Sequence, residues 1–387
     1  MTPQRIETWT LTWSLVALAL IGCAATPEPA TAAAATTPAK AHPTVEVATV
    51  VVSPYSETEL VAQFDAAKAR LLAEKYPDAA DMFDRLVRLA PDGVTAAPSL
   101  YNGGLAHEAL GDREGAVEHY REQLRRFPDA ETSRSALVRT TRLLAYLERW
   151  PDLAETAATL SKRTDVSVLE KVEALGHSAL GLAEQDKIEE ATKLTLAARD
   201  LVEENHLGES GKPPIEMAPV AFALGELRKR QSERIVFEPV PSNFGDVLEQ
   251  RCQGLLDAQN AYMDAMRSLD AHWSAMAGYR VGQMYQQLHR DVMRVPAPGR
   301  ADTLKKKQLF EGAMRLRYRV LLEKGLKMMD ATVRLGERTG ELSAWVGRAR
   351  DAKRDLELAM ESERAAMGKL PFTEQELQAA LDSLKKP

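Results

Sequence analysis

The chain has 387 residues, of which 45% are hydrophobic and 27% are charged, which is typical of a globular protein with one or two domains. Its formal net charge of -6 gives no overall attraction to nucleic acid, so nucleic-acid partners are excluded. Aromatic residues make up only 6% of the chain and few segments alternate at period two, so we expect an all-α fold without a large sheet.

A short apolar segment occupies residues 8–22. It is shorter than the roughly 20 residues that cross a bilayer, and it has the length of a signal-peptide core. The segment ends in Leu20-Ile21-Gly22-Cys23, which resembles the lipobox of bacterial lipoproteins. The resemblance implies a signal peptide at 1–22 and lipid attachment, as with palmitate, at Cys23. An uncleaved anchor and cleavage at Ala17-Leu18-Ala19 are the alternatives.

Residues 23–56 are rich in Ala, Thr and Pro and cannot bury a core, so we expect a disordered, lipid-anchored linker. Because Ala24 and not Asp follows the cysteine, the lipoprotein resemblance implies attachment to the outer membrane, facing the periplasm. The second cysteine, Cys252, then has no disulfide partner within the chain.

The most specific internal pattern lies at residues 100–128. Gly104 and Ala116 are small residues where two helices of a hairpin approach closely, and Gly111 falls where the chain turns. Pro128 stops the second helix because proline cannot continue one. This pattern resembles the tetratricopeptide repeat, whose helical hairpins stack into a solenoid.

Three further units extend the repeat region to 57–205. Residues 76–91 match the second half of the template, with Ala79, Phe83 and Val87 at the same distances before Pro91 as Ala116, Tyr120 and Leu124 before Pro128. Degenerate units follow at residues 137–165 and 175–201. A generic helical bundle is the alternative, but a match between two consecutive units favours the repeat.

The second half, 213–387, is predicted to be a helical C-terminal domain. Long helices are expected at 246–269, 271–295, 302–338 and 342–367, and a short last helix is expected after its N-cap Thr373. Within the second of these, Ala275, Gly278 and Gly282 form a small-residue stripe that lets a neighbouring helix pack closely. This segment resembles the C-terminal halves of repeat-containing lipoproteins from gliding-motility envelope machines.

Motifs for catalysis, nucleotides or metals are missing from the sequence. There is no phosphate-binding Gly-rich loop and no nucleophile elbow, and Cys252 is expected to be a small mid-helix residue. One Glu-x-x-His spacing, Glu203 to His206, runs into a Gly/Pro-rich break and is interpreted as a solvated helix end. We therefore predict no enzyme activity, no cofactor and no metal.

The repeat template also predicts a binding surface, because first helices line the groove of a tetratricopeptide solenoid. On alignment, the residues that face the groove are Phe64, Lys68, Tyr101, Leu105 and Glu108. Phe64 and Tyr101 are expected to be exposed aromatics that contact a partner, the alternative being that they pack within the solenoid. Phe64 replaces a lysine of the family's carboxylate clamp, although Asn102 is present, so we expect an apolar or mixed ligand.

These patterns predict a membrane-anchored scaffold for protein–protein interaction in a bacterial envelope assembly, with envelope proteins as partners and gliding motility as the process implied by resemblance. Assistance in outer-membrane protein or polysaccharide biogenesis is the alternative. A glycan-cleaving enzyme is a third class, but no paired acids in a cleft are indicated.

Overall fold

The computed structural model describes residues 55–209, 211–299 and 301–384. Within these ranges the protein is all-α, and no strand is present. The predicted signal peptide, the lipidation site Cys23 and nearly all of the predicted linker lie outside the described residues. In the described part, no helix combines the length and the apolar character needed to cross a bilayer.

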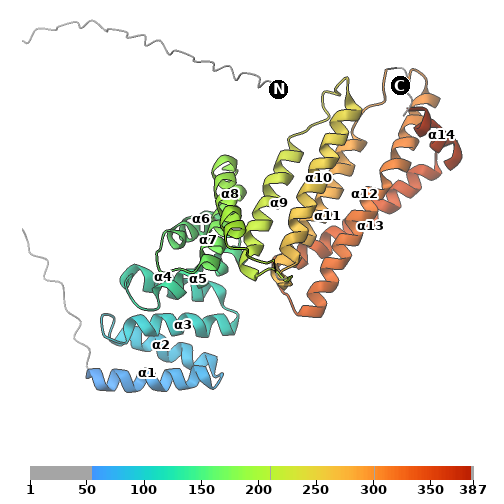
Figure 1. Cartoon of the computed structure of the whole chain (residues 1–387). Helices are drawn as coiled ribbons and strands as arrows, with labels where there is room; N and C mark the ends of the chain where they lie inside the picture. The colour runs from blue at the N-terminus through green and yellow to red at the C-terminus, as the bar shows by residue number, and fades with distance from the viewer. Residues whose placement is uncertain (1–54, 210, 300, 385–387) are drawn as a thin grey trace, which may run out of the picture. The chain divides into compact units, whose positions relative to one another are not determined.

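Four helical hairpins form a tetratricopeptide-type solenoid (Figure 1). Each helix packs against the next in the chain, and the first helices α5 and α7 also contact each other. The eight helices are α1 (Glu57–Leu72), α2 (Tyr76–Leu89), α3 (Ala96–Leu110), α4 (Arg113–Arg126), α5 (Ser133–Tyr146), α6 (Trp150–Ser161), α7 (Val168–Glu184) and α8 (Ile188–Glu204).

The turns inside the four hairpins share one backbone geometry. Each turn contains one residue with a positive φ: Glu74 (59°), Gly111 (78°), Glu148 (57°) and Asp186 (61°). In each case the next backbone N–H donates to the carbonyl oxygen five residues earlier, at 2.9–3.0 Å. This is the left-handed closure that satisfies the last carbonyl groups of a helix. Only one of the four turns has a glycine at this position, and glycine is the residue that indicates a left-handed conformation in a sequence.

Close helix packing in the second hairpin depends on the predicted glycine. A Cβ atom at Gly104 would lie 2.5 Å from the ring of Tyr120, which is fully buried. Ala116 is also fully buried, and α4 ends one residue before the cap Phe127 that precedes Pro128. A glycine packed against a tyrosine ring of the next helix also occurs beyond the predicted repeats, because a Cβ atom at Gly225 would lie 2.6 Å from the buried ring of Tyr262.

The second half consists of η1 (Ile215–Met217), α9 (Ala218–Glu233), α10 (Phe244–Met266), α11 (Ala271–Met293), α12 (Leu304–Thr339), α13 (Ala344–Gly368) and α14 (Glu374–Leu384). The four predicted long helices are confirmed within a few residues at each end. Thr373 and Glu376 form the expected reciprocal cap of α14, with hydrogen bonds of 2.7 and 3.3 Å. The small-residue stripe of α11 faces α12, since Cβ atoms at Gly278 and Gly282 would meet Thr332 and Met329.

The two halves share a hydrophobic core. The largest cluster of buried residues runs from Leu180 on α7 through Phe222 on α9 and Trp273 on α11 to Trp345 on α13. The predicted boundary at 205–213 falls in the loop between α8 and η1, and α7 packs directly against α9. All described helices belong to one compact unit.

Candidate protein-binding groove

A groove of about 420 Å³ lies on the second and third repeats. It is formed mainly by the first helices α3 and α5, together with the starts of α4 and α7, and we call it the α3–α5 groove. Its lining residues are Tyr101, Glu108, Arg113, Ser135, Val138, Arg139, Arg142, Leu143, Tyr146 and Glu170. Because first helices build it, the groove lies where the repeat template places a ligand.

Arg139 is fixed in the groove by side chains from α3. Its Nη1 atom lies 3.1 Å from Glu108 Oε2, and its Nε atom donates to the hydroxyl of Tyr101 at 3.4 Å. Glu108 also accepts a 2.5 Å hydrogen bond from the hydroxyl of Tyr120. Burial and the Glu108 carboxylate both raise the pKa of Tyr120, so this hydroxyl remains a donor. Arg139 is thereby held in place while 40% of its side-chain surface stays exposed.

Arg142 is fixed in a similar way by α7. Its Nε and Nη2 atoms donate to the two carboxylate oxygens of Glu173 at 2.7 and 2.8 Å. Burial alone would raise the pKa of Glu173, but His177 and Arg142 outweigh burial and lower that pKa to about 2. The carboxylate therefore stays ionised, and Arg142 keeps 49% of its side-chain surface in solvent.

A third arginine lies at the end of the groove nearest to the C-terminal helices. The guanidinium carbon of Arg113 is 3.8 Å from the centroid of the Tyr146 ring, which is cation–π geometry. The other face of Tyr146 stacks on His272 with a centroid separation of 4.5 Å, and its hydroxyl donates to Glu341 at 3.2 Å. Residues from both halves of the protein thus position this end of the groove.

The arrangement suits recognition of carboxylate groups by positioned arginines. Nη2 of Arg139 and Nη1 of Arg142 make no hydrogen bond to any of the described residues, so these planar donors are available to a ligand. The internal carboxylates hold the two side chains in place before binding, which lowers the entropy lost when a ligand is bound. The two acids in its lining already have partners, since Glu108 pairs with Arg139 and Glu170 accepts from the backbone N–H of Ser167.

The structure places the five predicted groove residues differently. Tyr101 and Glu108 line the α3–α5 groove, whereas Phe64, Lys68 and Leu105 lie outside its lining. Lys68 is exposed on α1, and Leu105 is half-buried on α3. No observation on these residues tests their role in binding, which stays a prediction.

The expected exposure of the two aromatic residues is corrected by the structure. Phe64 and Tyr101 are half-buried because each ring packs on an aromatic ring of the second helix in its own hairpin. Phe64 lies 5.8 Å from Phe83, and Tyr101 lies 5.7 Å from Tyr120. Packing between the two helices of a repeat therefore covers most of the surface of these two rings. Asn102 also makes a local contact, since its side chain donates to the backbone oxygen of Pro98 at 2.7 Å.

Eight of the ten residues that line the groove were not predicted from the sequence, among them Arg139, Arg142 and Tyr146 of α5. Arg139, Arg142 and Tyr146 follow one another at intervals of three and four, which places them on one face of a helix. The periodicity was therefore present. The third repeat is too degenerate for its first helix to be aligned with the template, so the face that they share could not be assigned to the groove.

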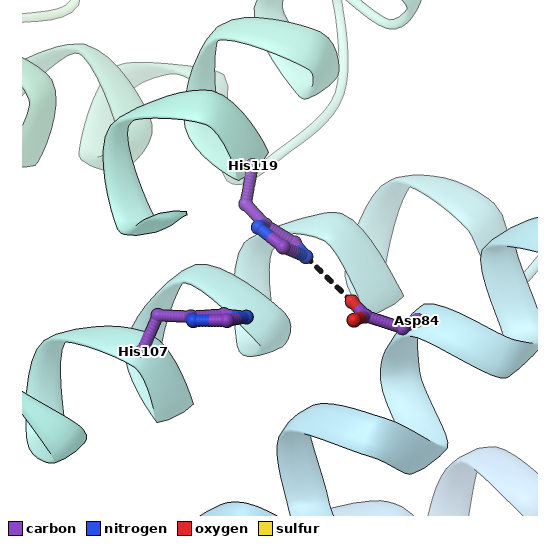
Figure 2. A group of neighbouring side chains, drawn as sticks. All are labelled: Asp84, His107 and His119. Carbon is purple, nitrogen blue, oxygen red and sulfur yellow. Dashed lines mark hydrogen bonds and ion pairs between the residues drawn. The ribbon is translucent and has the colours of Figure 1, made fainter. Parts of the chain in front are cut away.

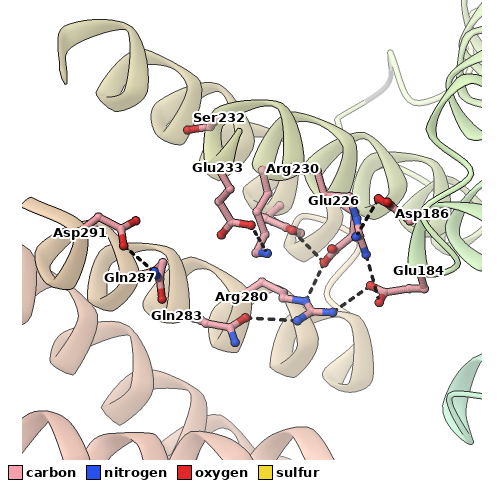
Figure 3. Close-up of polar contacts among 12 residues, drawn as sticks. Glu184, Asp186, Glu226, Arg230, Ser232, Glu233, Arg280, Gln283, Gln287 and Asp291 are labelled. Carbon is pink, nitrogen blue, oxygen red and sulfur yellow. Dashed lines mark hydrogen bonds and ion pairs between the residues drawn. The ribbon is translucent and has the colours of Figure 1, made fainter. Parts of the chain in front are cut away.

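A second polar region joins α7, α9 and α11, and it is a network of buried ion pairs (Figure 3). Arg280 lies between two carboxylates, with Nε 2.6 Å from Glu226 and Nη2 2.8 Å from Glu184. Burial raises the pKa of Glu184, as does the nearby Glu226. Burial opposes ionisation of Glu226 too, but Arg280 and Lys229 outweigh it and lower the pKa of Glu226.

A cavity of about 570 Å³ lies beside this network, between α9, α10 and α11. Four of its charged groups form pairs, Lys229 with Glu233 at 2.8 Å and Arg251 with Asp291 at 3.3 Å. Since these four charges have partners within the protein and the neighbouring Arg280 network is buried, we interpret this region as structural. Cys252 on α10 is partly buried, and burial raises the pKa of its thiol, which does not favour a reactive thiolate.

Comparisons with known proteins find similar solved structures at low identity, but no family. No protein-family model matches the chain, and no curated protein sequence matches it. Among solved structures, a tetratricopeptide repeat protein from Parabacteroides merdae is 11% identical, with 76% of this chain and 99% of that chain covered and a TM-score of 0.40. The apo form of RapI is also 11% identical, with coverage of 80% and 99% and a TM-score of 0.41. Yeast Tom70 is 12% identical, with coverage of 86% and 89% and a TM-score of 0.27.

Proposed function

We propose that this protein is a non-catalytic scaffold that binds a protein partner in the α3–α5 groove. The observation that carries the proposal is the pair of half-exposed arginines, Arg139 and Arg142, held by internal carboxylates in a groove lined by first helices of the repeats. Such a surface fits an extended peptide segment with acidic side chains. Val138 and the surface of Tyr101 and Tyr146 that stays accessible, all in the groove lining, provide apolar contact area, so the expected ligand is mixed in character.

We further propose that the scaffold is held at a bacterial membrane through lipid on Cys23 and acts in a multi-protein envelope assembly. The support is the lipobox-like sequence that ends a short apolar segment, followed by an Ala/Thr/Pro-rich linker. Attachment to the outer membrane and a part in gliding motility follow from resemblance alone. Assistance in outer-membrane protein or polysaccharide biogenesis is the second candidate, since a lipid-anchored scaffold serves either process.

The groove is tested by the variant Ser135→Glu. Ser135 lines the groove on the first turn of α5, a turn that has no acidic residue. A glutamate there favours the helix, because negative charge near a helix N-terminus contributes about 0.3–1 kcal/mol. It also places a carboxylate beside Arg139 and Arg142, where it competes with an acidic ligand. We therefore expect an unchanged or slightly raised Tm together with loss of the partner.

The measurement is cross-linking of the full-length protein in its own envelope, followed by recovery and identification of bound proteins. Thr192→Glu is the matched control, since Thr192 is exposed on the second helix α8, away from the groove. Partners recovered with wild type and Thr192→Glu, but lost with Ser135→Glu, support the groove. Equal recovery in all three proteins would show that partners bind elsewhere.

A further inference from the structure

Three potential metal ligands converge between the first two repeats (Figure 2). Asp84 comes from α2, His107 from the end of α3 and His119 from α4, and one ligand atom of each lies within 4.8 Å of the others. The side chains are partly accessible, with 29% of Asp84 and 17% of His119 exposed, so an ion can reach them. The sequence predicts no metal site, because the three residues are distant from one another in the chain and match no ligand motif.

Hydrogen bonds fix which nitrogen of each histidine is free. Nδ1 of His119 lies 2.8 Å from the carbonyl oxygen of Gly115, which can only accept, so this nitrogen carries the proton. Nδ1 of His107 lies 2.8 Å from the carboxylate of Asp112. The same carboxylate accepts from the backbone N–H of Gly115 at 3.1 Å, which places it as an acceptor at this helix cap. When both rings are neutral, each Nε2 atom therefore carries no proton and has a free lone pair.

With both rings neutral, neither Nε2 atom faces a hydrogen-bond donor within the described residues. Nε2 of His107 is buried and has no hydrogen-bond partner. Nε2 of His119 lies 2.7 Å from Oδ1 of Asp84, which is also an acceptor. Two acceptors at that distance need a cation between them. A proton would bridge His119 and Asp84 but would leave Nε2 of His107 without a partner, whereas a metal ion can bind all three groups.

Two glycines make room for this arrangement. A Cβ atom at Gly103 would lie 2.8 Å from Cδ2 of His119, and a Cβ atom at Gly115 would lie 2.8 Å from Nδ1 of His107. The rings consequently occupy space that any other residue would fill. Metal-bound histidines generally donate their second N–H to a carboxylate or a backbone carbonyl, and here each ring has one such acceptor.

We propose that Asp84, His107 and His119 bind a divalent transition-metal ion, zinc in particular, and that the ion ties the first two repeats together. Two imidazole nitrogens and one carboxylate oxygen are a donor set that zinc accepts, with a fourth position left for water. Zn–N distances of about 2.0–2.1 Å place tetrahedral ligands roughly 3.4 Å apart, so small side-chain rotations complete the site. Calcium and magnesium prefer oxygen ligands and are not expected to bind.

The test is zinc titration of the metal-free, full-length protein without an affinity tag, by calorimetry and by Co²⁺ absorption. We expect one zinc ion per chain at this site and a rise in Tm, with no response to Mg²⁺. His107→Gln and His119→Gln are each expected to weaken zinc binding by about 100-fold or more. Loss of a ligand is expected to cost more than the 10- to 100-fold loss of affinity that follows removal of a group hydrogen-bonded to a ligand. His206→Gln is the control, since His206 is exposed and pairs only locally with Glu209.

Asp112→Asn separates a metal role from a structural one. Oδ1 of Asp112 caps α4 by accepting from the N–H of Gly115 at 3.1 Å, and asparagine caps equally well. The new amide group would donate to Nδ1 of His107, which moves the ring proton to Nε2 and removes the ligand. We expect zinc affinity to fall about 10- to 100-fold while Tm without metal is unchanged.

Three results would overturn the proposal. They are an absence of zinc binding to the wild-type protein at micromolar concentrations, wild-type affinity in the histidine variants, and wild-type affinity in Asp112→Asn. If a histidine variant fails to fold, Asp112→Asn decides the question, because it keeps the helix cap. The outcome is independent of the α3–α5 groove, since Ser135→Glu leaves the three ligands in place.

Discussion

Replacing Arg280 with methionine is expected to destabilise the junction between the repeats and the C-terminal helices. Arg280 contacts Glu226 on α9 at 2.6 Å and Glu184 on α7 at 2.8 Å, and its guanidinium carbon lies 5.0 Å from the centroid of the Trp345 ring on α13. Glu226 is fully buried, so water cannot take the place of the arginine. Methionine keeps most of the side-chain volume, so the loss is chiefly electrostatic.

Removal of one partner from a buried ion pair costs about 3–5 kcal/mol, because the other charge is left without compensation. We expect the lower part of that range, since Tyr262 still donates to Glu226 at 2.9 Å. A loss of that size lowers Tm by roughly 4–6 °C in a protein of this length. Thermal unfolding followed by far-UV circular dichroism measures the shift.

The effect is expected to depend on pH. In the wild-type protein the pKa of Glu226 is below its ordinary value of 4.5, so its ionisation stabilises the fold above that pH and the contribution is lost as pH falls. In Arg280→Met, burial is less opposed and raises the pKa of Glu226. Keeping the ionised carboxylate of Glu226 buried in this variant then lowers the stability of the fold at neutral pH. The loss is smaller once the carboxylate is protonated. The difference between the two proteins is therefore largest at pH 7 and shrinks toward pH 4.5.

Two further variants check the reasoning. Glu226→Gln in the Arg280→Met background removes the uncompensated charge and is expected to recover much of the loss, which gives a coupling of at least about 1 kcal/mol. Arg319→Met is the control, because Arg319 is 58% exposed and makes only a local pair with Glu323, which contributes about 0.5 kcal/mol or less. An Arg280→Met protein with the stability of the control would refute the buried-charge explanation.

Three other predictions concern the anchor, the repeat packing and the aromatic pairs. Cys23→Ser is expected to abolish incorporation of a clickable fatty acid, and equal labelling of the variant would rule out lipid attachment there. Gly104→Ala is expected to cost about 1–3 kcal/mol, since its Cβ atom would lie 2.5 Å from a buried tyrosine ring, whereas Gly347→Ala meets nothing within 4 Å and is expected to be neutral or stabilising in thermal melts. Phe64→Ala with Tyr101→Ala is expected to lower Tm by several degrees, because both rings are half-buried; an unchanged Tm would show that the rings contribute nothing to packing within the repeats.

The sequence determined the fold class because helix periodicity, small residues and stop signals are local properties. Gly104, Ala116 and Pro128 specify one hairpin almost completely, and α11, α12 and α13 end near a proline or a glycine. The anchor at Cys23 and the scaffold function are predictions from sequence that the described residues do not test.

Only the tertiary structure decided which side chains meet. The α3–α5 groove combines α3, α5 and α7, the Arg280 network combines α7, α9 and α11, and the three potential zinc ligands come from α2, α3 and α4. Each depends on the packing of helices that are separate in the chain, and no periodicity within one helix encodes it. The same reason explains the correction to Phe64 and Tyr101. Their positions on first helices follow from sequence, but their burial is set by the aromatic partner that the second helix of the hairpin presents.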